Sequence, residues 1–231
     1  PTGFEVVAGA RIGRWWDAFG DPELSSLVER ATIANKDLVL ATARVAEAQS
    51  LYRATRSAEF PSIDSVAGVD YERSSVNALF PGGNDATVWS VGVSASWEVD
   101  IFGRVRRSVE SSDATFQASE EDRRGVLVAV IAQVASAYVD VRTVQRRLDV
   151  ARQNLASQGK IVDLTKIRFE GGIASSLDVA QAESIYANTR TFIPPLEAEL
   201  ARQINRLSVL LGENPGPLAS ELTATAPMPA P

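Results

Sequence analysis

The side chains that most often carry enzyme chemistry are missing from this sequence. Its 231 residues include no cysteine and no histidine. Within the sequence this excludes thiol nucleophiles, disulfides, zinc sites built from cysteine or histidine, and any histidine-based triad. Chemistry based on carboxylates, lysine or serine remains available.

The acidic residues do not form a pattern that indicates catalysis. Residues such as Glu120, Glu121 and Asp122 are expected to be solvated charges on a helix face. No carboxylate pair has a spacing that alone would make it catalytic, and no motif places a base beside a nucleophile. A carboxylate-based hydrolase therefore has little support. We expect no enzyme activity, no catalytic residue, no metal site and no cofactor.

Composition indicates a folded protein that does not bind nucleic acid. The sequence is 45% hydrophobic and 23% charged, with a net charge of -6. Nucleic-acid binders usually carry a basic stripe, which this balance does not favour. No run of about 18 apolar residues occurs, so we expect no transmembrane helix. No signal peptide is recognised in the numbered chain.

The first part of the chain predicts an extended lead-in followed by two helices. Residues 1–22 are rich in glycine and contain Trp15 and Trp16, which we expect to dock on an apolar surface. Asp21 and Pro22 form a helix start, with Asp21 as the N-cap. Residues 23–60 then predict a pair of short helices, the second with the apolar spacing of a coiled coil.

A strand with two different faces follows. Between Val88 and Ile101 apolar and polar or small residues alternate without exception. An earlier segment, 63–75, alternates more loosely, and 75–87 predicts a long loop. The apolar face of the second strand consists of Trp89, Val91, Val93, Ala95, Trp97, Val99 and Ile101.

Two interpretations of this strand are open. Across all sequences, an ordinary half-buried strand of a soluble sheet is the usual explanation. Against it, Trp89 and Trp97 lie about 26 Å apart along a strand, near the ~25 Å apolar band of a membrane barrel. A lone hairpin among helices is also barely stable in water. The pattern favours a membrane strand paired with strands of other copies.

The second half of the chain predicts a long helical hairpin. From Arg104 to about Glu170 there is no proline, and an apolar seam at coiled-coil spacing predicts a helix of about 100 Å. Gly171 and Gly172 predict its end, and Ser175 begins a second helix to about Leu211. We expect Pro194-Pro195 to kink that helix, and 213–231 to form an uncoupled Pro/Ala-rich tail. Periodicity alone would equally fit a structural coiled coil or a spectrin-like bundle.

Several motifs resemble the TolC-like outer-membrane efflux family, in its OprM/NodT lipoprotein branch. They occur in the family order over nearly the whole chain, and the motif at the strand-to-helix junction together with that at the helix turn is fairly specific. The motifs are Trp15-Trp16-Asp17-Ala18-Phe19-Gly20-Asp21-Pro22-Glu23-Leu24, Asn35-Lys36-Asp37-Leu38, Phe60-Pro61, Trp97-Glu98-Val99-Asp100-Ile101-Phe102-Gly103-Arg104, Arg168-Phe169-Glu170-Gly171-Gly172-Ile173, Leu177-Asp178-Val179-Ala180-Gln181-Ala182-Glu183 and Val209-Leu210-Leu211-Gly212.

The resemblance implies a passive channel component rather than an enzyme. It implies a homotrimer whose barrel lies in outer-membrane lipid, with a helical tunnel in the periplasm that a periplasmic adaptor and an inner-membrane efflux pump supply with drugs or other small molecules. By position, Gly171, Gly172 and Ile173, with Leu177 close behind, match the adaptor-docking tip. Asp178 matches an acidic residue that helps to latch the tunnel mouth.

The chain departs from the family pattern in two ways. Family members carry two such repeats, and this sequence ends where the second would begin. The acylated N-terminal cysteine of the lipoprotein branch is also absent. We therefore expect a fragment that contains the first repeat.

The expected fold is mainly α, with long antiparallel coiled-coil helices and one inserted β-hairpin. In order, we expect a lead-in (1–22), an equatorial-type helix pair (23–60), a hairpin of membrane-barrel strands (61–102), a long periplasmic helical hairpin with its tip near 170–176 (103–212) and a tail (213–231). The alternative function is a non-transport periplasmic coiled-coil scaffold.

Overall fold

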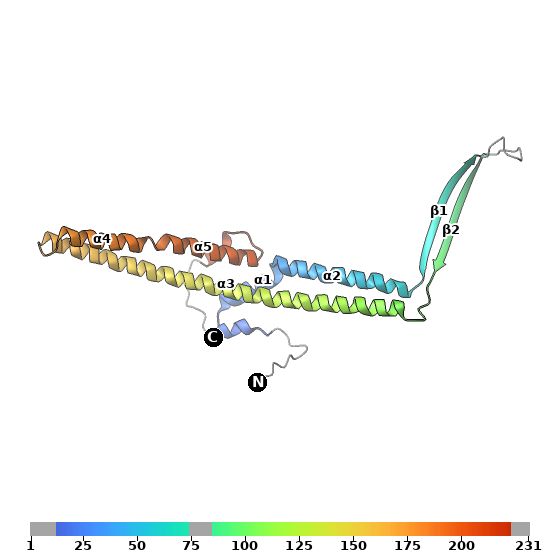
Figure 1. The fold of residues 1–231 in the computed structure, drawn as a ribbon, viewed down its shortest axis with the longest axis horizontal. Coiled ribbons are helices and arrows are strands. Elements are labelled where there is room, and N and C mark those ends of the chain that lie inside the picture. The colour runs from blue at the N-terminus through green and yellow to red at the C-terminus, as the bar shows by residue number, and fades with distance from the viewer. Residues whose placement is uncertain (1–12, 74–84, 223–231) are drawn as a thin grey trace, which may run out of the picture. The chain divides into compact units, whose positions relative to one another are not determined.

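The computed structural model describes residues 13–73 and 85–222. Within them the chain is mainly helical and carries one antiparallel β-hairpin, as the sequence predicts (Figure 1). The chain divides into two compact units. The first comprises residues up to Thr42 together with those from Asp122 onward, and the second is Ala43–Glu121.

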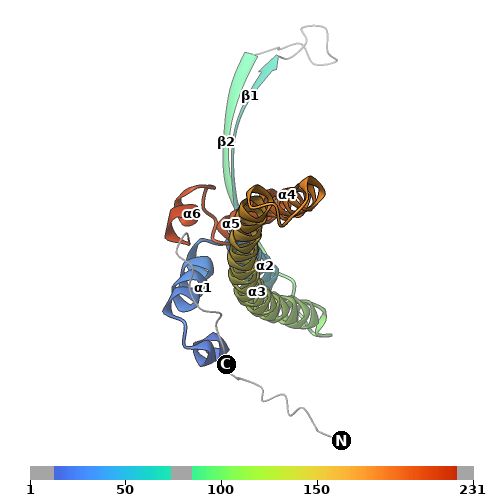
Figure 2. The ribbon, with the colours of Figure 1, turned by 90° about the vertical axis from the view of Figure 1, so that its left-hand side faces the viewer.

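The core of the first unit forms where four helices meet. These are α1 (Pro22–Ala34), the middle of α3 (Arg104–Glu170), α5 (Ile193–Leu210) and the short α6 (Pro217–Glu221). Figure 2 shows α1 and α6 on the same side of the α3–α5 pair. The fully buried large side chains there include Leu24, Leu27, Val28, Ile131, Val134, Tyr138, Val141, Leu207, Leu211, Leu218 and Leu222.

The start of α1 is fixed by the predicted cap. Asp21 Oδ1 accepts hydrogen bonds from the backbone N–H groups of Glu23 at 2.9 Å and Leu24 at 3.2 Å. The other oxygen, Oδ2, accepts from the Tyr138 hydroxyl at 2.6 Å, which ties α1 to α3. Burial, and secondarily the bond to Asp21, raises the pKa of Tyr138 to about 12, so its hydroxyl remains protonated at neutral pH.

The sequence predicts an extended segment before α1, but the structure has a short helix there. Trp15–Phe19 form a 3-10 helix, η1, and the chain turns at Gly20 with a left-handed φ of 60°. Trp16 is buried in the core of the first unit, whereas Trp15 is exposed. The expectation of docked tryptophans therefore holds for Trp16 only, because a tight helix points adjacent side chains in different directions.

The prediction that residues 213–231 form an uncoupled tail is wrong for the described part of that segment, which ends at Leu222. After the turn at Gly212, α6 inserts Leu218 and Leu222 into the core. The Gln145 side-chain amide donates to the Leu222 carbonyl at 2.5 Å. Local sequence rules favour a loop here because of the prolines, but burial of two leucines outweighs that preference. Residues 223–231 lie outside the described part of the chain.

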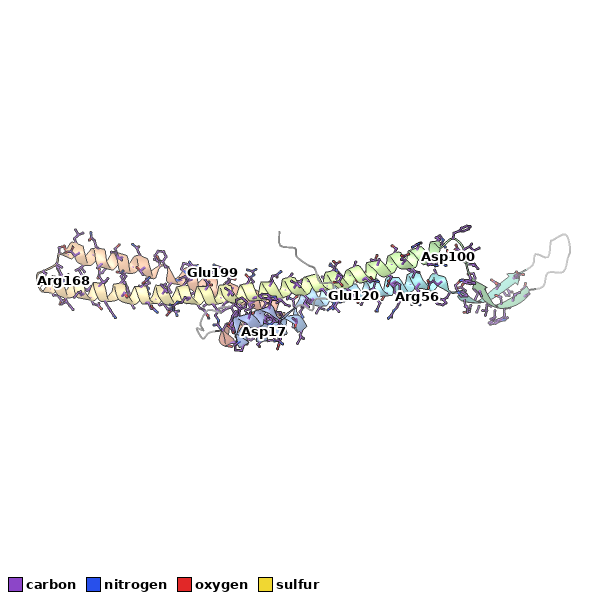
Figure 3. The ribbon with its side chains drawn as sticks, turned by 90° about the horizontal axis from the view of Figure 1, so that it is seen from below. Asp17, Arg56, Asp100, Glu120, Arg168 and Glu199 are labelled. Carbon is purple, nitrogen blue, oxygen red and sulfur yellow. The ribbon has the colours of Figure 1, made fainter. Side chains whose placement is uncertain are left out.

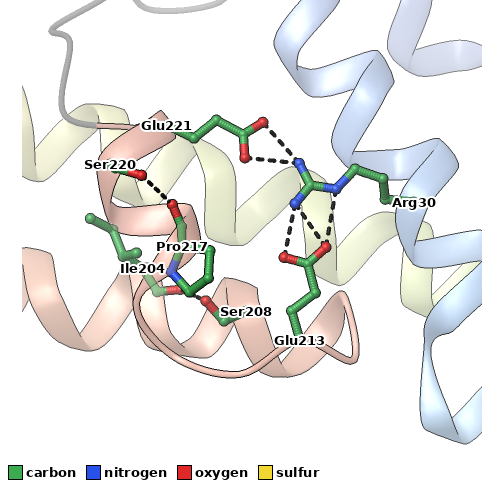
Figure 4. A network of polar contacts seen from close by, with 7 residues as sticks. All are labelled: Arg30, Ile204, Ser208, Glu213, Pro217, Ser220 and Glu221. Atoms are coloured by element: carbon green, nitrogen blue, oxygen red, sulfur yellow. Dashed lines mark hydrogen bonds and ion pairs between the residues drawn. The ribbon is translucent and has the colours of Figure 1, made fainter.

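An arginine on α1 also holds this C-terminal segment (Figure 4). The Arg30 guanidinium bonds both carboxylate oxygens of Glu213, at 2.8 and 2.9 Å from Nη2, and both oxygens of Glu221, at 2.8 and 3.0 Å from Nη1. Its planar fork suits such bidentate pairing. Since each carboxylate is about one-third exposed, these pairs direct the path of the segment more than they stabilise it.

The helix that returns along α3 is interrupted before the two prolines. It consists of α4 (Ser176–Arg190) and α5, with Thr191 and Phe192 between them. Pro194 and Pro195 lie in the first turn of α5, where a missing N–H is tolerated. We expected a kink at the prolines. The break comes earlier because they cannot donate to the carbonyls one turn before them.

The second unit contains the hairpin and the helices that lead into it. It includes the end of α2 (Lys36–Arg56), the short 3-10 helix η2 (Ser57–Glu59), β1 (Ser62–Arg73), β2 (Asp85–Ser96) and the start of α3. The rings of Tyr52 and Phe116 stack with centroids 6.3 Å apart, which joins α2 to α3.

The second strand is shorter than its sequence pattern predicts. The alternation continues to Ile101, but β2 ends at Ser96. Trp97, Val99 and Ile101 are therefore not strand residues, and this part of the prediction is wrong. Alternation shows which side chains share a face, but a strand also needs a pairing partner. Here the partner strand β1 begins at Ser62, which pairs with Ser96. Most of the predicted 75–87 loop lies outside the described residues.

We expect no transmembrane helix from the sequence, but one helix among the described residues is long and apolar enough to cross a membrane by length and composition. This helix is α3. A core helix passes the same test, and α3 contributes Val130, Ile131, Val134, Tyr138 and Val141 to the core of the first unit. A search for an unbroken apolar run does not detect this segment, because polar residues interrupt it.

Two glycines give a matched test of the fold. Gly212 has φ 68°, and a Cβ there would lie 2.3 Å from the Ala34 carbonyl oxygen, whereas Gly125 lies in α3 with open space around it. We expect Gly212→Ala to lower the free energy of unfolding by more than about 1 kcal/mol. Gly125→Ala should raise it by about 1 kcal/mol through helix propensity. Urea denaturation followed by circular dichroism measures both, and equal effects would contradict the assigned close approach.

Candidate functional site

The predicted lipid-facing surface forms one side of the hairpin. Antiparallel pairing sets Ile63 opposite Ala95, Ser65 opposite Val93, Ala67 opposite Val91 and Val69 opposite Trp89. The predicted strand residues Trp89, Val91, Val93 and Ala95 thus share one face, and Val91 is 86% exposed. Nothing within the described residues covers this face.

The other side of the hairpin is mostly polar or small. Its pairs include Ser62 with Ser96, Asp64 with Ser94, and Gly68 with Ser90. The hydroxyl oxygens of Ser62 and Ser96 are 2.9 Å apart, within hydrogen-bond distance. Val66 and Val88 also fall on this side, so its polarity is not complete. The hairpin therefore presents one apolar and one largely hydrophilic surface.

The hairpin also has two open edges. Among the described residues the sheet contains only β1 and β2. Each strand therefore offers a row of backbone N–H and C=O groups to further strands. A barrel in a membrane satisfies such groups by closing on itself, since lipid cannot.

The predicted site residue Trp97 lies just beyond the strand. Its indole N–H donates to the Glu59 carbonyl at 3.2 Å, which links the two connections between the hairpin and the helices. Trp97 is exposed, as predicted, but it belongs to the junction and not to the strand face.

The predicted docking tip is an exposed turn between α3 and α4. Figure 3 shows Arg168 at this end of α3. Gly172 adopts a left-handed φ of 72°, and the Ile173 N–H donates to the Arg168 carbonyl at 2.8 Å, which closes the end of α3. Ile173 and Leu177 are 78% and 64% exposed. Together with Gly171 they form an apolar tip that the described residues leave uncovered.

The predicted latch residue Asp178 is part of a capping box. Its N–H donates to the Ser175 hydroxyl oxygen at 3.2 Å, and its Oδ2 accepts from the Ser175 N–H at 2.7 Å and hydroxyl at 2.8 Å. The bond from the Ser175 backbone, and then that from its hydroxyl, lowers the pKa of Asp178 below its usual range. Both bonds use Oδ2, so a latch partner would have to approach the other oxygen.

A groove beside the tip was not predicted as a site. It has a volume of about 500 Å³, lies between α3 and α4, and is lined by Ile161, Ile173, Asp178 and Ile185 among others. The sequence does show Ile161, Leu164 and Ile167 as a separate seam. Of these, Ile161 lines the groove, whereas Leu164 and Ile167 are exposed and do not. The sequence could not show which of them lies beside α4, because that depends on the turn at Gly172.

The described residues hold no group of three or more acidic, histidine or cysteine side chains placed to bind a metal ion.

Known proteins share this sequence pattern and fold. The sequence profile of the outer membrane efflux protein family matches residues 27–213. The pyoverdine export outer membrane protein OpmQ of Pseudomonas aeruginosa is 33% identical over 224 residues, which cover 92% of this chain and 47% of that protein. Nodulation protein T of Rhizobium leguminosarum bv. trifolii is 30% identical over 216 residues, covering 94% of this chain and 46% of its own length.

Solved structures of related proteins have the same fold as this chain. The outer-membrane channel OprN superposes with a TM-score of 0.83 at 34% identity, covering 94% of this chain and 48% of that one. CusC superposes with a TM-score of 0.79 at 26% identity, covering 93% and 48%.

The chain belongs to the outer membrane efflux protein family, and the family's location is the outer membrane. This confirms the resemblance drawn from the motifs. The relatives are named as export and channel proteins, not enzymes. The chain spans about half the length of the relatives that it matches.

The pKa of Asp178 gives a test of the α4 cap. Because its folded-state pKa is lowered, the cap is complete above the ordinary Asp value and is lost as pH falls through the lower folded value. Asp178→Asn should remove this dependence and speed amide hydrogen exchange in the first turn of α4. Asp163→Asn, in the last two turns of α3, is the control. Unchanged exchange in Asp178→Asn would contradict the capping role.

Proposed function

We propose that the full-length protein is the outer-membrane channel of a tripartite efflux system. In this proposal three copies form a barrel and a helical tunnel, through which drugs or other small molecules leave the periplasm passively. A periplasmic adaptor and an inner-membrane pump load the tunnel, and no bond is made or broken.

The exposed apolar face of the hairpin carries this proposal. Trp89 and Val93 are each 75% exposed and Val91 is 86% exposed. A soluble protein rarely leaves such a continuous apolar surface uncovered. The two strands are each 12 residues long, enough to cross the hydrocarbon region when tilted. Apolar exposure on one face and serines on the other match a strand between lipid and a water-filled bore.

The tip supports the docking part of the proposal. Gly171, Gly172, Ile173 and Leu177 lie where α3 ends and α4 begins, and the described residues leave the apolar side chains of Ile173 and Leu177 exposed. An apolar patch of this kind, held on rigid helices, suits contact with a helical adaptor. Asp178 adjoins it, and in the proposal its carboxylate forms part of the latch that keeps the tunnel mouth closed.

A charge on the apolar face tests membrane insertion. Val93→Asp in the full-length protein should prevent assembly in the outer membrane, because a lipid-facing charge costs about 2–4 kcal/mol at mid-depth. Ser94→Asp places the same charge on the opposite face at the neighbouring position and should assemble normally. Trimer yield in membrane fractions is the measurement. Normal yield of Val93→Asp would instead favour a periplasmic coiled-coil scaffold.

A charge at the tip tests docking separately. Gly172→Glu should abolish drug export and adaptor crosslinking while trimers still form. Since Gly172 has φ 72°, any side chain strains the turn, so Gly172→Ala is the matched control for strain. If Gly172→Glu exports and crosslinks as the wild type does, the tip is not the docking surface.

A further inference from the structure

A groove in the first unit lies where the helix that returns along α3 is broken. Both α4 and α5 run beside α3, and Thr191 and Phe192 separate them (Figure 1). The groove has a volume of about 360 Å³. Two arginines and four apolar residues make up most of its lining, and we call it the basic groove. These residues are Arg146, Arg147, Val150, Ala151, Phe192 and Leu196.

Apolar side chains form the wall of the basic groove at the break. Phe192 is 66% exposed and Val150 is 43% exposed. The Thr191 N–H donates to the Asn188 carbonyl at 3.1 Å, and the Phe192 N–H donates to the Thr189 carbonyl at 3.3 Å. These bonds hold the backbone of the break, so the aromatic ring projects from an ordered turn. An exposed ring held in this way is suited to contact a ligand.

Arg147 brings to the groove a positive charge that has no contact partner among the described residues. Its side chain is exposed and takes part in no hydrogen bond or ion pair with residues 13–73 and 85–222. The pKa of the Glu199 carboxyl on α5 (Figure 3) is lowered, first by a hydrogen bond from Gln203, then by one from Arg202, and last by the charge of Arg147. That carboxylate is therefore already engaged, and the Arg147 guanidinium remains available to an added anion.

The second arginine of the groove is only weakly neutralised. Arg146 pairs with Asp149 at 3.3 Å, and both side chains are at least 40% exposed, so water screens the pair. None of the described residues that line the groove is acidic, whereas the whole sequence has a net charge of -6. Asn154 also lines it and offers an amide donor. The basic groove is thus complementary to an anion that also has an apolar surface.

A second groove beside the same helices differs in charge. It has a volume of about 430 Å³ and is lined by Asp149, Arg152 and Glu197 among others. Arg152 and Glu197 neutralise each other in an ion pair at 2.8 Å, which leaves the negative charge of Asp149. The charges therefore favour an anion in the basic groove and disfavour one in this second groove.

We propose that the basic groove binds a small aromatic carboxylate. The ring of the ligand lies against Phe192, Val150 and Leu196. Its carboxylate accepts hydrogen bonds from the Arg147 guanidinium, whose planar fork suits such pairing. The groove volume of about 360 Å³ is that of a small-ligand pocket, whereas a helix of a second copy is about 10–12 Å wide with its side chains. The proposal concerns the first unit alone and does not depend on the proposed function.

A fluorine label in the groove tests the proposal. The full-length protein carries para-fluorophenylalanine in place of Phe192 and is held in phosphatidylcholine nanodiscs, and fluorine NMR follows the label. The probes are biphenyl carboxylate and aminomethyl biphenyl, which have the same apolar body and opposite charges at neutral pH. Arg147→Gln removes the available cation of the groove. Arg206→Gln removes an exposed cation of α5 that does not line the groove, and it is the matched control.

We expect the carboxylate to shift the signal of the label in a saturable way and the amine to cause no such shift. Arg147→Gln should weaken binding of the carboxylate about fivefold, and Arg206→Gln should leave it unchanged. Equal responses to the two probes, or equal affinity of Arg147→Gln and the unsubstituted protein for the carboxylate, would overturn the inference. So would a label that neither probe shifts. If that label is also shielded from a water-soluble paramagnetic chelate, another part of the assembly covers the groove.

Discussion

The structure depends on one constraint: a two-stranded hairpin cannot bury its own apolar face. Trp89, Val91 and Val93 lie on the same side of a sheet that has no third strand among the described residues. Water penalises this surface by roughly 25 cal/mol for each Å² that stays exposed. The backbone edges also remain open. Both deficits are removed together if strands from several copies close a barrel in lipid, as membership of the outer membrane efflux protein family leads one to expect.

The first unit solves the opposite problem, since it must hold long helices with a small core. Its buried side chains gather where α1, α5 and α6 meet the middle of α3. Polar bonds add direction to this packing. A continuous chain of hydrogen bonds runs from α1 across α3 to the C-terminal segment. It passes through Asp21, Tyr138, Arg142, Gln145 and the Leu222 carbonyl. The core therefore fixes the crossing point, and the helices extend from it with little support.

Toward the tip the packing becomes thin. Beyond the break at Thr191 and Phe192, Ala182 is the buried residue of α4, and on the facing end of α3 it is Val162. The Lys166–Glu183 ion pair, at 2.7 Å, is about half exposed and contributes little. Such a region opens locally at low cost, because it has few buried apolar contacts to lose. Within the described residues, the ends of α3 and α4 near the tip therefore stabilise each other only weakly.

The sequence by itself determined the order of elements and the local signals. Caps, glycine turns and periodicity located the start of α1 at Asp21 and the turn at Gly171-Gly172, since these depend on neighbours along the chain. It also identified the apolar face of β2. Tertiary structure decided what those signals could not: β2 ends at Ser96 because its partner begins at Ser62, and the proline-rich segment folds because Leu218 and Leu222 find a core built from distant residues. Pairing and burial depend on residues far away in the sequence, so no local pattern contains them.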